Sequence, residues 1–244
     1  MKENKYDDEA FFKKYSEMNR SKEGLEGAGE WSELQKLLPE FAGKRVLDLG
    51  CGYGWHCQYA AQNGAEYVIG TDISTKMLER AIERNSHEKI EYRRCAMEEI
   101  DFPEHSFDIV ISSLAFHYVE DFKPLVTKIS RMTAPGGFFI FSAEHPVFTA
   151  HGTQDWFYDE QGEILHFPVD NYFYEGKRDA VFLGEPVTKY HRTLTTYLNT
   201  LLKNGFELLD ITEPQPPEDM MDIPGMPDEM RRPMMLIVKA RKRP

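Results

Sequence analysis

The sequence predicts an α/β fold in which helices cover both faces of a mainly parallel sheet. Three observations favour this fold. Apolar residues at 46, 47 and 49 lead into three glycines at alternate positions and a helical pattern, the usual opening of a nucleotide-binding strand–turn–helix unit. Strand and helix patterns then alternate as far as residue 141. Two last strand patterns, 206–211 and 234–240, have no helix between them, which implies an antiparallel pair.

Composition limits the classes of protein to which the chain can belong. Its 244 residues suffice for one domain, 1–244, with insertions. A net charge of −12 argues against a nucleic-acid partner, because phosphate binding needs a basic face. No apolar run approaches the roughly 20 residues of a membrane span, and the charged N-terminus does not resemble a signal peptide. Cys51, Cys57 and Cys95 lack zinc-like spacing, so we expect a reduced cytoplasmic protein without a metal site.

The spacing of the glycines narrows the choice of ligand. Gly50, Gly52 and Gly54 would let a ligand lie against the main chain. The helix that follows offers unpaired N–H groups and a partial positive charge. A dinucleotide-binding turn, G-x-G-x-x-G/A, needs a small residue at position 55, where Trp55 stands instead. An acidic residue, Asp48, precedes the turn inside the strand, and the pattern as a whole disfavours a pyrophosphate ligand.

Residues 46–54, Val-Leu-Asp-Leu-Gly-Cys-Gly-Tyr-Gly, resemble motif I of the class I S-adenosylmethionine-dependent methyltransferases, whose usual form is close to LDLGCGTG. A Pro-Gly-Gly turn before the strand pattern at 138–141 and the final strand pair are further marks of that family. The resemblance implies a Rossmann-like seven-stranded sheet of order 3-2-1-4-5-7-6, with strand 7 antiparallel. It also implies S-adenosylmethionine as cofactor and, because the chain looks like the small-molecule type (methyltransferase domain 11-like), a small-molecule methyl acceptor.

The second strand pattern, 67–70, ends at an acid that is placed to bind a ribose. The carboxylate of Asp72 can accept hydrogen bonds from both hydroxyls of a ribose diol. Its alternative role is to cap the following helix, but Ser74 is available for that. We therefore favour ribose binding.

The resemblance implies further cofactor-binding residues at the ends of the other strands. Ala96 and Met97 would border the adenine, although Cys95 stands where the family usually has an acid, and Met97 could equally be core filling. Arg20 would pair with the cofactor carboxylate. Together, the residues expected to bind the cofactor are Arg20, Asp48, Gly50, Cys51, Gly52, Gly54, Asp72, Ile73, Met77, Ala96, Met97, Ser113, Leu114 and Phe116.

Three segments lie outside the repeating pattern. Residues 1–44 carry two helical patterns with a loop at 20–29, and we expect a cap over the cofactor, or packing at the sheet edge. Residues 146–192 hold ten aromatic residues, too many for a disordered loop. We expect an insertion that covers the substrate, with a hairpin around 159–163. Its alternative is the interface of a homo-oligomer. Residues 214–233 would be a mobile loop or a second lip of the site.

Methyl transfer from a sulfonium is an in-line displacement, so the protein mainly aligns the reacting groups and excludes water. A base is needed only if the nucleophile must lose a proton. His117 and His145 are the predicted candidates, with Glu144 and His191 as alternatives, and His117 could equally be a packed wall. The acidic chain and the aromatic insertion favour a small, partly apolar acceptor.

Two other functions compete with methyl transfer. The first is a non-catalytic protein that binds the cofactor or a partner, since the cofactor half is better marked than the acceptor half. The second is an NAD-dependent oxidoreductase, against which Trp55 and the final strand pair both argue.

Overall fold

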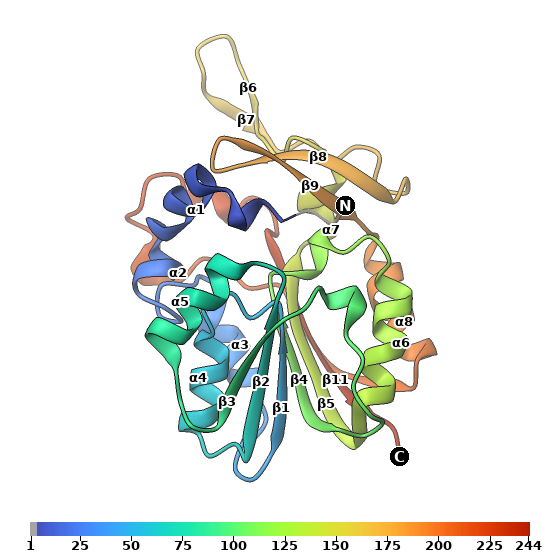
Figure 1. Ribbon diagram of the computed structural model, residues 1–244. Coiled ribbons are helices and arrows are strands. Elements are labelled where there is room, and N and C mark those ends of the chain that lie inside the picture. Colours follow the sequence, from blue (N-terminus) through green and yellow to red (C-terminus); the bar gives the residue numbers. More distant parts are fainter. Residues whose placement is uncertain (1–3) are drawn as a thin grey trace.

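A sheet of seven strands forms the middle layer of the structure, a computed structural model that describes residues 4–244 (Figure 1). In the order in which they lie across the sheet, the strands are β10 (Phe206–Thr212), β11 (Met235–Lys242), β5 (Thr133–Glu144), β4 (Phe107–Ser113), β1 (Arg45–Leu49), β2 (Tyr67–Asp72) and β3 (Ile90–Arg94). Strands β1 to β5 are parallel, and β11 is antiparallel to both neighbours. Because β10 and β11 are the sixth and seventh of these strands in chain order, the predicted order 3-2-1-4-5-7-6 is confirmed.

Helices cover both faces of the sheet, as the sequence predicts (Figure 1). One face carries α3 (Trp31–Leu37), α4 (Trp55–Gln62) and α5 (Thr75–Asn85), and the other carries α6 (Phe122–Met132) and α8 (Leu194–Lys203). Two buried clusters fill these interfaces because successive strand residues point to opposite faces. In β1, Val46 packs with the cluster of α3 and α4, whereas Leu47 packs with that of α6 and α8.

The strand β5 is longer than its apolar pattern indicates. The sequence predicts a strand only at 138–141 after a Pro-Gly-Gly turn, but β5 runs from Thr133 to Glu144. The Pro-Gly-Gly residues lie in its first part, where the register with β4 shifts between Phe107 and Ile109. At its other end, β5 brings Glu144 to the edge of the sheet where the parallel strands end. A charged side chain therefore reaches the edge at which α/β proteins build their sites.

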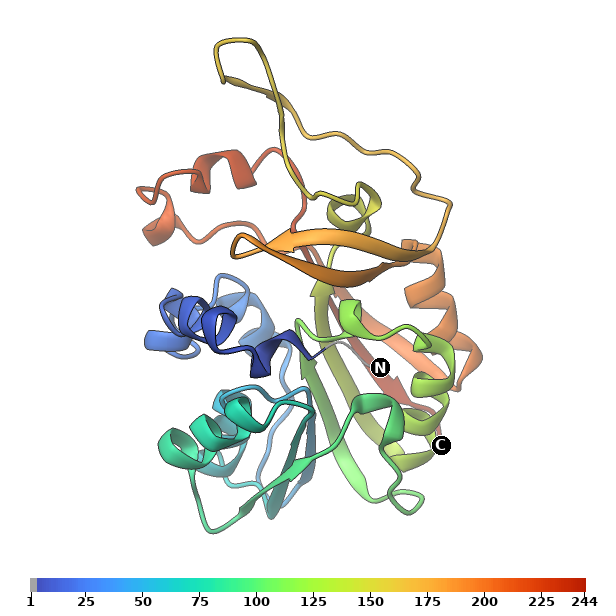
Figure 2. The same cartoon turned by 45° about the horizontal axis from the view of Figure 1, so that its top comes forward.

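The N-terminal helices lie over that edge. They are η1 (Lys5–Asp7), α1 (Glu9–Ser16) and α2 (Asn19–Lys22), so the loop predicted at 20–29 is partly helical. Asp7 Oδ1 accepts hydrogen bonds from Ser74 Oγ (2.6 Å) and Lys76 N (3.1 Å), at the start of α5. Figure 2 shows these blue helices between the sheet and the red loop that follows β10. The N-terminal segment is thus fixed beside the end of β2.

The insertion at 146–192 forms one short helix and two antiparallel hairpins. Its elements are α7 (Pro146–Ala150), β6 (Phe157–Tyr158), β7 (Ile164–His166), β8 (Gly176–Phe182) and β9 (Glu185–His191). The predicted hairpin around 159–163 is the β6–β7 pair. Phe11 of α1 is fully buried against Ala180 and Val187, so the second hairpin packs on the N-terminal helices. The insertion and the N-terminal segment form one cover over the sheet edge (Figure 1).

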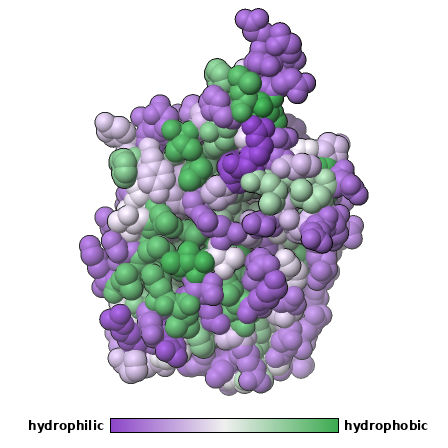
Figure 3. Space-filling view, turned by 180° about the vertical axis from the view of Figure 1, so that it is seen from behind, coloured by the Kyte–Doolittle hydropathy of each residue, from purple (hydrophilic) through white to green (hydrophobic). Residues whose placement is uncertain are grey.

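The β6–β7 hairpin projects from this cover. Its tip is hydrophilic and its base is apolar (Figure 3), and Phe157 and Leu165 are about half exposed there. The remaining short helices are η2 (Met97–Glu99), η3 (Phe116–Tyr118), η4 (Glu218–Met220) and α9 (Met226–Glu229). Within residues 4–244, no helix has both the length and the apolar character of a membrane span. The same residues contain no group of three or more His, Cys, Asp or Glu side chains that could hold a metal ion.

Candidate cofactor and acceptor site

A cavity of about 940 Å³ lies above the carboxyl ends of β1, β2 and β4, under the N-terminal helices, the insertion and the loop at 214–230. Small-molecule sites usually measure about 300–1,000 Å³, so this cavity can hold a cofactor together with a small acceptor. The segment 214–233, predicted as a mobile loop or a second lip, contributes residues between Pro214 and Glu229 to the wall. Of the predicted cofactor-binding residues, the cavity brings together Arg20, Gly50, Cys51, Gly52, Asp72, Ile73, Met77, Ala96, Met97, Ser113 and Leu114.

The three glycines of the turn after β1 have different roles. All three have positive φ angles, between +54° and +75°. A Cβ on Gly52 would meet nothing within 4 Å, so this glycine leaves open space at the cavity floor. A Cβ on Gly50 would lie 2.7 Å from Ala115 Cβ, and one on Gly54 would lie 2.7 Å from Tyr92 Cζ. Gly54 is not part of the cavity wall. It makes room for Tyr92, whereas the sequence predicts that it admits the cofactor.

Two further predicted cofactor residues lie behind the wall. Asp48 is 1% exposed, and its Oδ2 accepts a hydrogen bond from Cys57 Sγ (3.3 Å) while Oδ1 has no partner. Burial raises the pKa of this carboxyl to about 7. Phe116 is fully buried and packs against Phe122 and Phe141 in the core, although its neighbour in η3, His117, lines the cavity. Asp48 and Phe116 therefore lie behind the residues that line the cavity.

Asp72 is held rigidly at the end of β2. Its Oδ2 accepts a hydrogen bond from Gly52 N (2.9 Å), and its Oδ1 accepts one from Ser74 N (2.8 Å). The hydroxyl of Ser74 caps α5 by accepting a bond from Met77 N (3.1 Å), so Asp72 does not have the capping role. Burial raises the pKa of Asp72 to about 6 despite these bonds. Each carboxylate oxygen keeps a second lone pair for a ribose hydroxyl.

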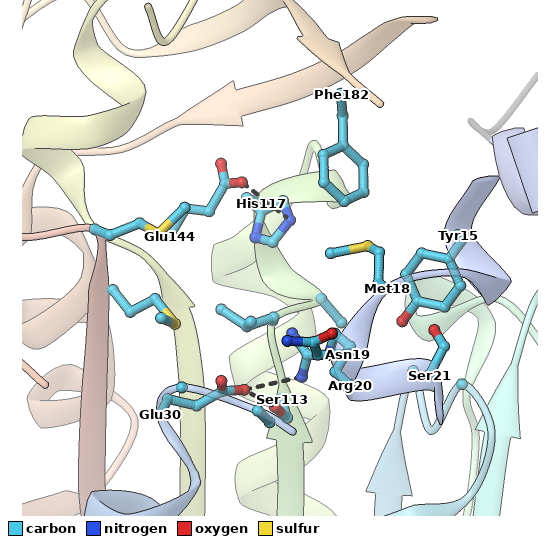
Figure 4. A pocket seen from close by; sticks show the side chains of 18 of the residues that line it. Tyr15, Met18, Asn19, Arg20, Ser21, Glu30, Ser113, His117, Glu144 and Phe182 are labelled. Carbon is cyan, nitrogen blue, oxygen red and sulfur yellow. Dashed lines mark hydrogen bonds and ion pairs between the residues drawn. The ribbon is translucent and has the colours of Figure 1, made fainter. Parts of the chain in front are cut away.

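A pair of opposite charges lies beside the end of β4 (Figure 4). Arg20 Nη2 and Ser113 Oγ donate to the same oxygen of Glu30, Oε1, at 2.9 and 3.1 Å. Glu30 is 2% exposed. Although burial alone would raise its pKa, the charge of Arg20 holds the pKa of this carboxyl below its usual value. Adjacent positive and negative groups suit the amino-acid end of S-adenosylmethionine, which carries both a carboxylate and an ammonium.

The backbone beside this pair is strained. Leu114 has φ +48°, and its N–H donates to both the carbonyl oxygen and the hydroxyl of Ser142 (3.0 Å each). A leucine in the left-handed region costs energy and marks functional sites more often than other positions. The conformation turns the chain sharply after β4, so that Leu114 and Ala115 line the cavity. These features, the open space at Gly52, the Asp72 carboxylate and the Arg20–Glu30 pair, fit the predicted cofactor.

The other end of the cavity has aromatic walls and one buried polar network. Lys189 Nζ contacts Glu144 Oε1 (2.5 Å) and Gln154 Oε1 (2.8 Å), and Gln154 Nε2 donates to Glu144 Oε2 (2.7 Å). His117 Nε2 lies 3.9 Å from Glu144 Oε1. Figure 4 shows His117 in the middle of the cavity, with Glu144 on one side and Phe182 above.

Burial sets the protonation states in this network. It lowers the pKa of His117 to about 4, since the charge of Glu144 only partly offsets the loss of water, so the imidazole is neutral at pH 7. Burial alone would raise the pKa of Glu144, but His117 and Lys189 hold it below its usual value. A neutral imidazole and an ionised carboxylate therefore share this end of the cavity.

The other predicted histidines have structural contacts. His145 caps α7, because its Nδ1 accepts a hydrogen bond from Val147 N (3.0 Å), and its Nε2 lies 2.9 Å from Glu213 Oε1. His191 is fully buried, and its ring nitrogens contact Thr149 Oγ1 and the Tyr172 carbonyl, both at 2.8 Å. Neither histidine lines the cavity. Of the three histidines, only His117 lines the cavity, and it shares that end with Glu144, the fourth candidate.

Sequence reasoning missed Glu30, Gln154 and Lys189. Glu30 stands in a glycine-bearing loop before α3, and Gln154 follows α7 in an irregular segment. Lys189 lies in β9 among alternating residues, where a lysine usually faces solvent, yet its side chain is only 3% exposed. The one sequence signal for Lys189 is its place in the alternating pattern of β9, at a position that faces the interior.

Comparison with known proteins identifies the family. A model described as a methyltransferase domain matches residues 47–141. A crystal structure of an S-adenosylmethionine dependent methyltransferase from Mesorhizobium loti is 42% identical, with a TM-score of 0.83, and covers 90% of this chain and 100% of that one. The chain belongs to the S-adenosylmethionine-dependent methyltransferases. A candidate member of the same class from Listeria monocytogenes is 51% identical, with a TM-score of 0.86 over 91% of this chain and 100% of that one.

The similarity to other proteins extends beyond residues 47–141 of this methyltransferase. An uncharacterized protein of Haemophilus influenzae is 34% identical over 97% of this chain and 96% of its own length. The predicted family, the enzyme class and the cofactor, S-adenosylmethionine, are confirmed, whereas the comparisons leave the methyl acceptor open.

Proposed function

We propose that this methyltransferase transfers the methyl group to a small, partly apolar acceptor that binds in the upper part of the cavity. The observation that carries the proposal is the division of one cavity into two chemically different ends. The lower end offers a carboxylate, Asp72, and the charged pair of Arg20 and Glu30. The upper end offers aromatic walls, among them Tyr118 and Phe182. A small molecule with an apolar body matches the upper end.

The residues of the lower end bind the cofactor in this proposal. Asp72 accepts the ribose hydroxyls, Ala96 and Met97 border the adenine, and Gly52 lets the cofactor lie against the main chain. Arg20 binds the carboxylate of the methionine end. When bound, the cofactor supplies an activated methyl group, so the protein has to align the acceptor and exclude water.

The N-terminal segment and the insertion exclude water in this proposal. The hydroxyls of Tyr6 and Tyr118 lie 3.1 Å apart and join η1 to the turn after β4, directly at the cavity. Phe182 of the insertion reaches into the same space (Figure 4). In this proposal the cap at 1–44 therefore covers the cofactor, and the insertion at 146–192 covers the substrate. Opening of the cover is then required for acceptor entry and product release.

The experiment is methyl transfer from S-adenosylmethionine labelled on the methyl group to a panel of small metabolites. The proposal expects label in at least one small-molecule product. A protein that binds the cofactor but labels only protein or nucleic acid contradicts it. Two lesser proposals accompany it: a cytoplasmic location, supported by three free cysteines, and a homo-oligomer, supported by the half-exposed Phe157 and Leu165. Light scattering of the purified protein tests the second.

A further inference from the structure

The distance between His117 and Glu144 matches the space that one bridging oxygen atom needs. At 3.9 Å, His117 Nε2 and Glu144 Oε1 are too far apart for a direct hydrogen bond. Consider an oxygen atom placed at the usual hydrogen-bond distance of about 2.8 Å from both of them. The angle at that oxygen between the two atoms would be about 90°. That angle suits an oxygen that accepts one hydrogen bond and donates another. The two side chains thus bracket a position for one hydroxyl group.

The tautomer of His117 agrees with this arrangement. His117 Nδ1 is buried and has no hydrogen-bond partner. A buried N–H without a partner is rarer in proteins than a buried acceptor without one, so the ring hydrogen belongs on Nε2. His117 then presents Nε2–H on the Glu144 side, and Glu144 presents an ionised oxygen. One side chain donates and the other accepts.

Two residues of the insertion fix the carboxylate in place. Lys189 from β9 and Gln154 from the segment after α7 each contact a different oxygen of Glu144. These bonds hold the carboxylate rigid and favour its ionised form. Both oxygens keep a free lone pair. Lys189 and Gln154 are therefore positioning residues, which act through Glu144.

We propose that the His117–Glu144 pair binds the hydroxyl group that is methylated, so that the enzyme is an O-methyltransferase for small apolar or aromatic hydroxyl compounds. This inference rests on the proposed function and refines its acceptor class. His117 Nε2–H donates to the hydroxyl oxygen, and the hydroxyl hydrogen points to Glu144 Oε1. An amine does not fit, because a buried carboxylate would hold it as an ammonium without a free lone pair.

The reaction balances with these groups alone. A lone pair of the hydroxyl oxygen forms the bond to the methyl carbon, and the carbon–sulfur bond of the cofactor breaks with its electron pair left on sulfur. The hydroxyl proton passes to Glu144 Oε1. As the oxygen gains the methyl group it becomes strongly acidic, so a carboxylate of ordinary basicity suffices to take the proton.

The first part of the test is the acceptor panel. Labelled S-adenosylmethionine is offered with substituted phenols, aliphatic alcohols, primary amines and thiols, each at equal concentration. The inference expects transfer to hydroxyl compounds. Transfer to amines or thiols alone overturns it while leaving the proposed function intact. Transfer to none of the four classes overturns both.

The second part separates chemistry from folding. E144Q alone leaves Lys189 charged and buried without an opposite charge, which can unfold the insertion. The double variant E144Q/K189M removes both charges, and the inference expects kcat for the best hydroxyl acceptor to fall about 100-fold or more with an unchanged Kd for the cofactor. The matched control is K14M/E185Q, which removes an ion pair (2.8 Å) between α1 and the same insertion outside the cavity. It should keep kcat.

Variants of His117 complete the test. H117Q keeps an amide N–H donor near the position of Nε2, whereas H117F keeps the ring shape and loses the donor. The inference expects H117Q to retain more kcat than H117F, with equal cofactor binding in both. E144Q/K189M with wild-type kcat, or H117F equal to H117Q, would show that the pair has only a structural role and would overturn the inference.

Discussion

Replacing Gly54 or Gly52 with alanine should damage different properties of the enzyme. At Gly54 an alanine has a left-handed conformation (φ +75°), which costs about 1–2 kcal/mol. Its Cβ would also overlap the Tyr92 ring, at 2.7 Å from Cζ, and displace the hydroxyl that donates to the Asn85 carbonyl (2.9 Å). Overpacking of this kind costs about 1–3 kcal/mol. The free energy of unfolding should therefore fall by about 2–5 kcal/mol.

At Gly52 an alanine has the same backbone strain (φ +54°) but meets no atom within 4 Å. The unfolding free energy should fall by only about 1–2 kcal/mol. The added methyl group projects into the cavity floor, so overlap with the cofactor of about 1–3 kcal/mol should weaken its binding about 5- to 150-fold. Gly54→Ala should leave the affinity of the folded protein for S-adenosylmethionine nearly unchanged.

Chemical denaturation of the cofactor-free variants gives the first quantity, and calorimetric titration with S-adenosylmethionine gives the second. The control is Gly54→Ala in a Tyr92→Leu background, where the shorter side chain removes the overlap and the cost should drop to that of strain alone. Equal destabilisation by Gly54→Ala in both backgrounds would refute the steric account. So would a loss of cofactor affinity in Gly54→Ala as large as that in Gly52→Ala.

Further predictions concern the charged residues of the cavity. Asp72→Ala should weaken S-adenosylmethionine binding by about 1–3 kcal/mol, the scale of lost hydrogen bonds, and calorimetry with unchanged affinity would reject the ribose role. Because burial raises the pKa of Asp72 to about 6, its carboxylate loses acceptor capacity as the pH falls below 6. Cofactor affinity should therefore drop between pH 7 and 5 in the wild type, and an Asp72→Asn variant that still showed the full drop would contradict this assignment. Arg20→Met should weaken cofactor binding and leave Glu30 buried without its ion pair, so the melting temperature should also fall. If the cofactor affinity and the melting temperature both stayed unchanged, Arg20 would not belong to the site. Lys189→Met should destabilise the protein by about 3–5 kcal/mol, the scale for breaking a buried pair, and a change below 1 kcal/mol in chemical denaturation would show that Glu144 is not ionised there.

The cofactor half could be predicted from sequence because its signals are local. The helix α5 begins after Ser74, whose hydroxyl caps it, and the strand predicted at 67–70 lies within β2 (Tyr67–Asp72). The apolar residues Val46, Leu47 and Leu49 predicted a strand buried on both faces, which β1 is. The order of the strands was implied by the resemblance to the family. Asp72 was found for the same reason, since its position depends only on the end of a strand.

The acceptor half could not be predicted in this way because its contacts join distant parts of the chain. Lys189 and Glu144 are 45 residues apart, and Arg20 reaches Ser113 through Glu30. No periodicity connects such residues. The sequence likewise placed Gly54 at the cofactor, because the motif does not reveal that Tyr92 of β3 lies against it.

The most direct measurement is a crystal structure of the enzyme with S-adenosylhomocysteine bound. The account predicts the ribose hydroxyls on the Asp72 carboxylate, the amino-acid end beside Arg20 and Glu30, and the sulfur directed toward His117 and Glu144. Density for the ribose away from Asp72, or a sulfur directed away from the His117–Glu144 end, would contradict it.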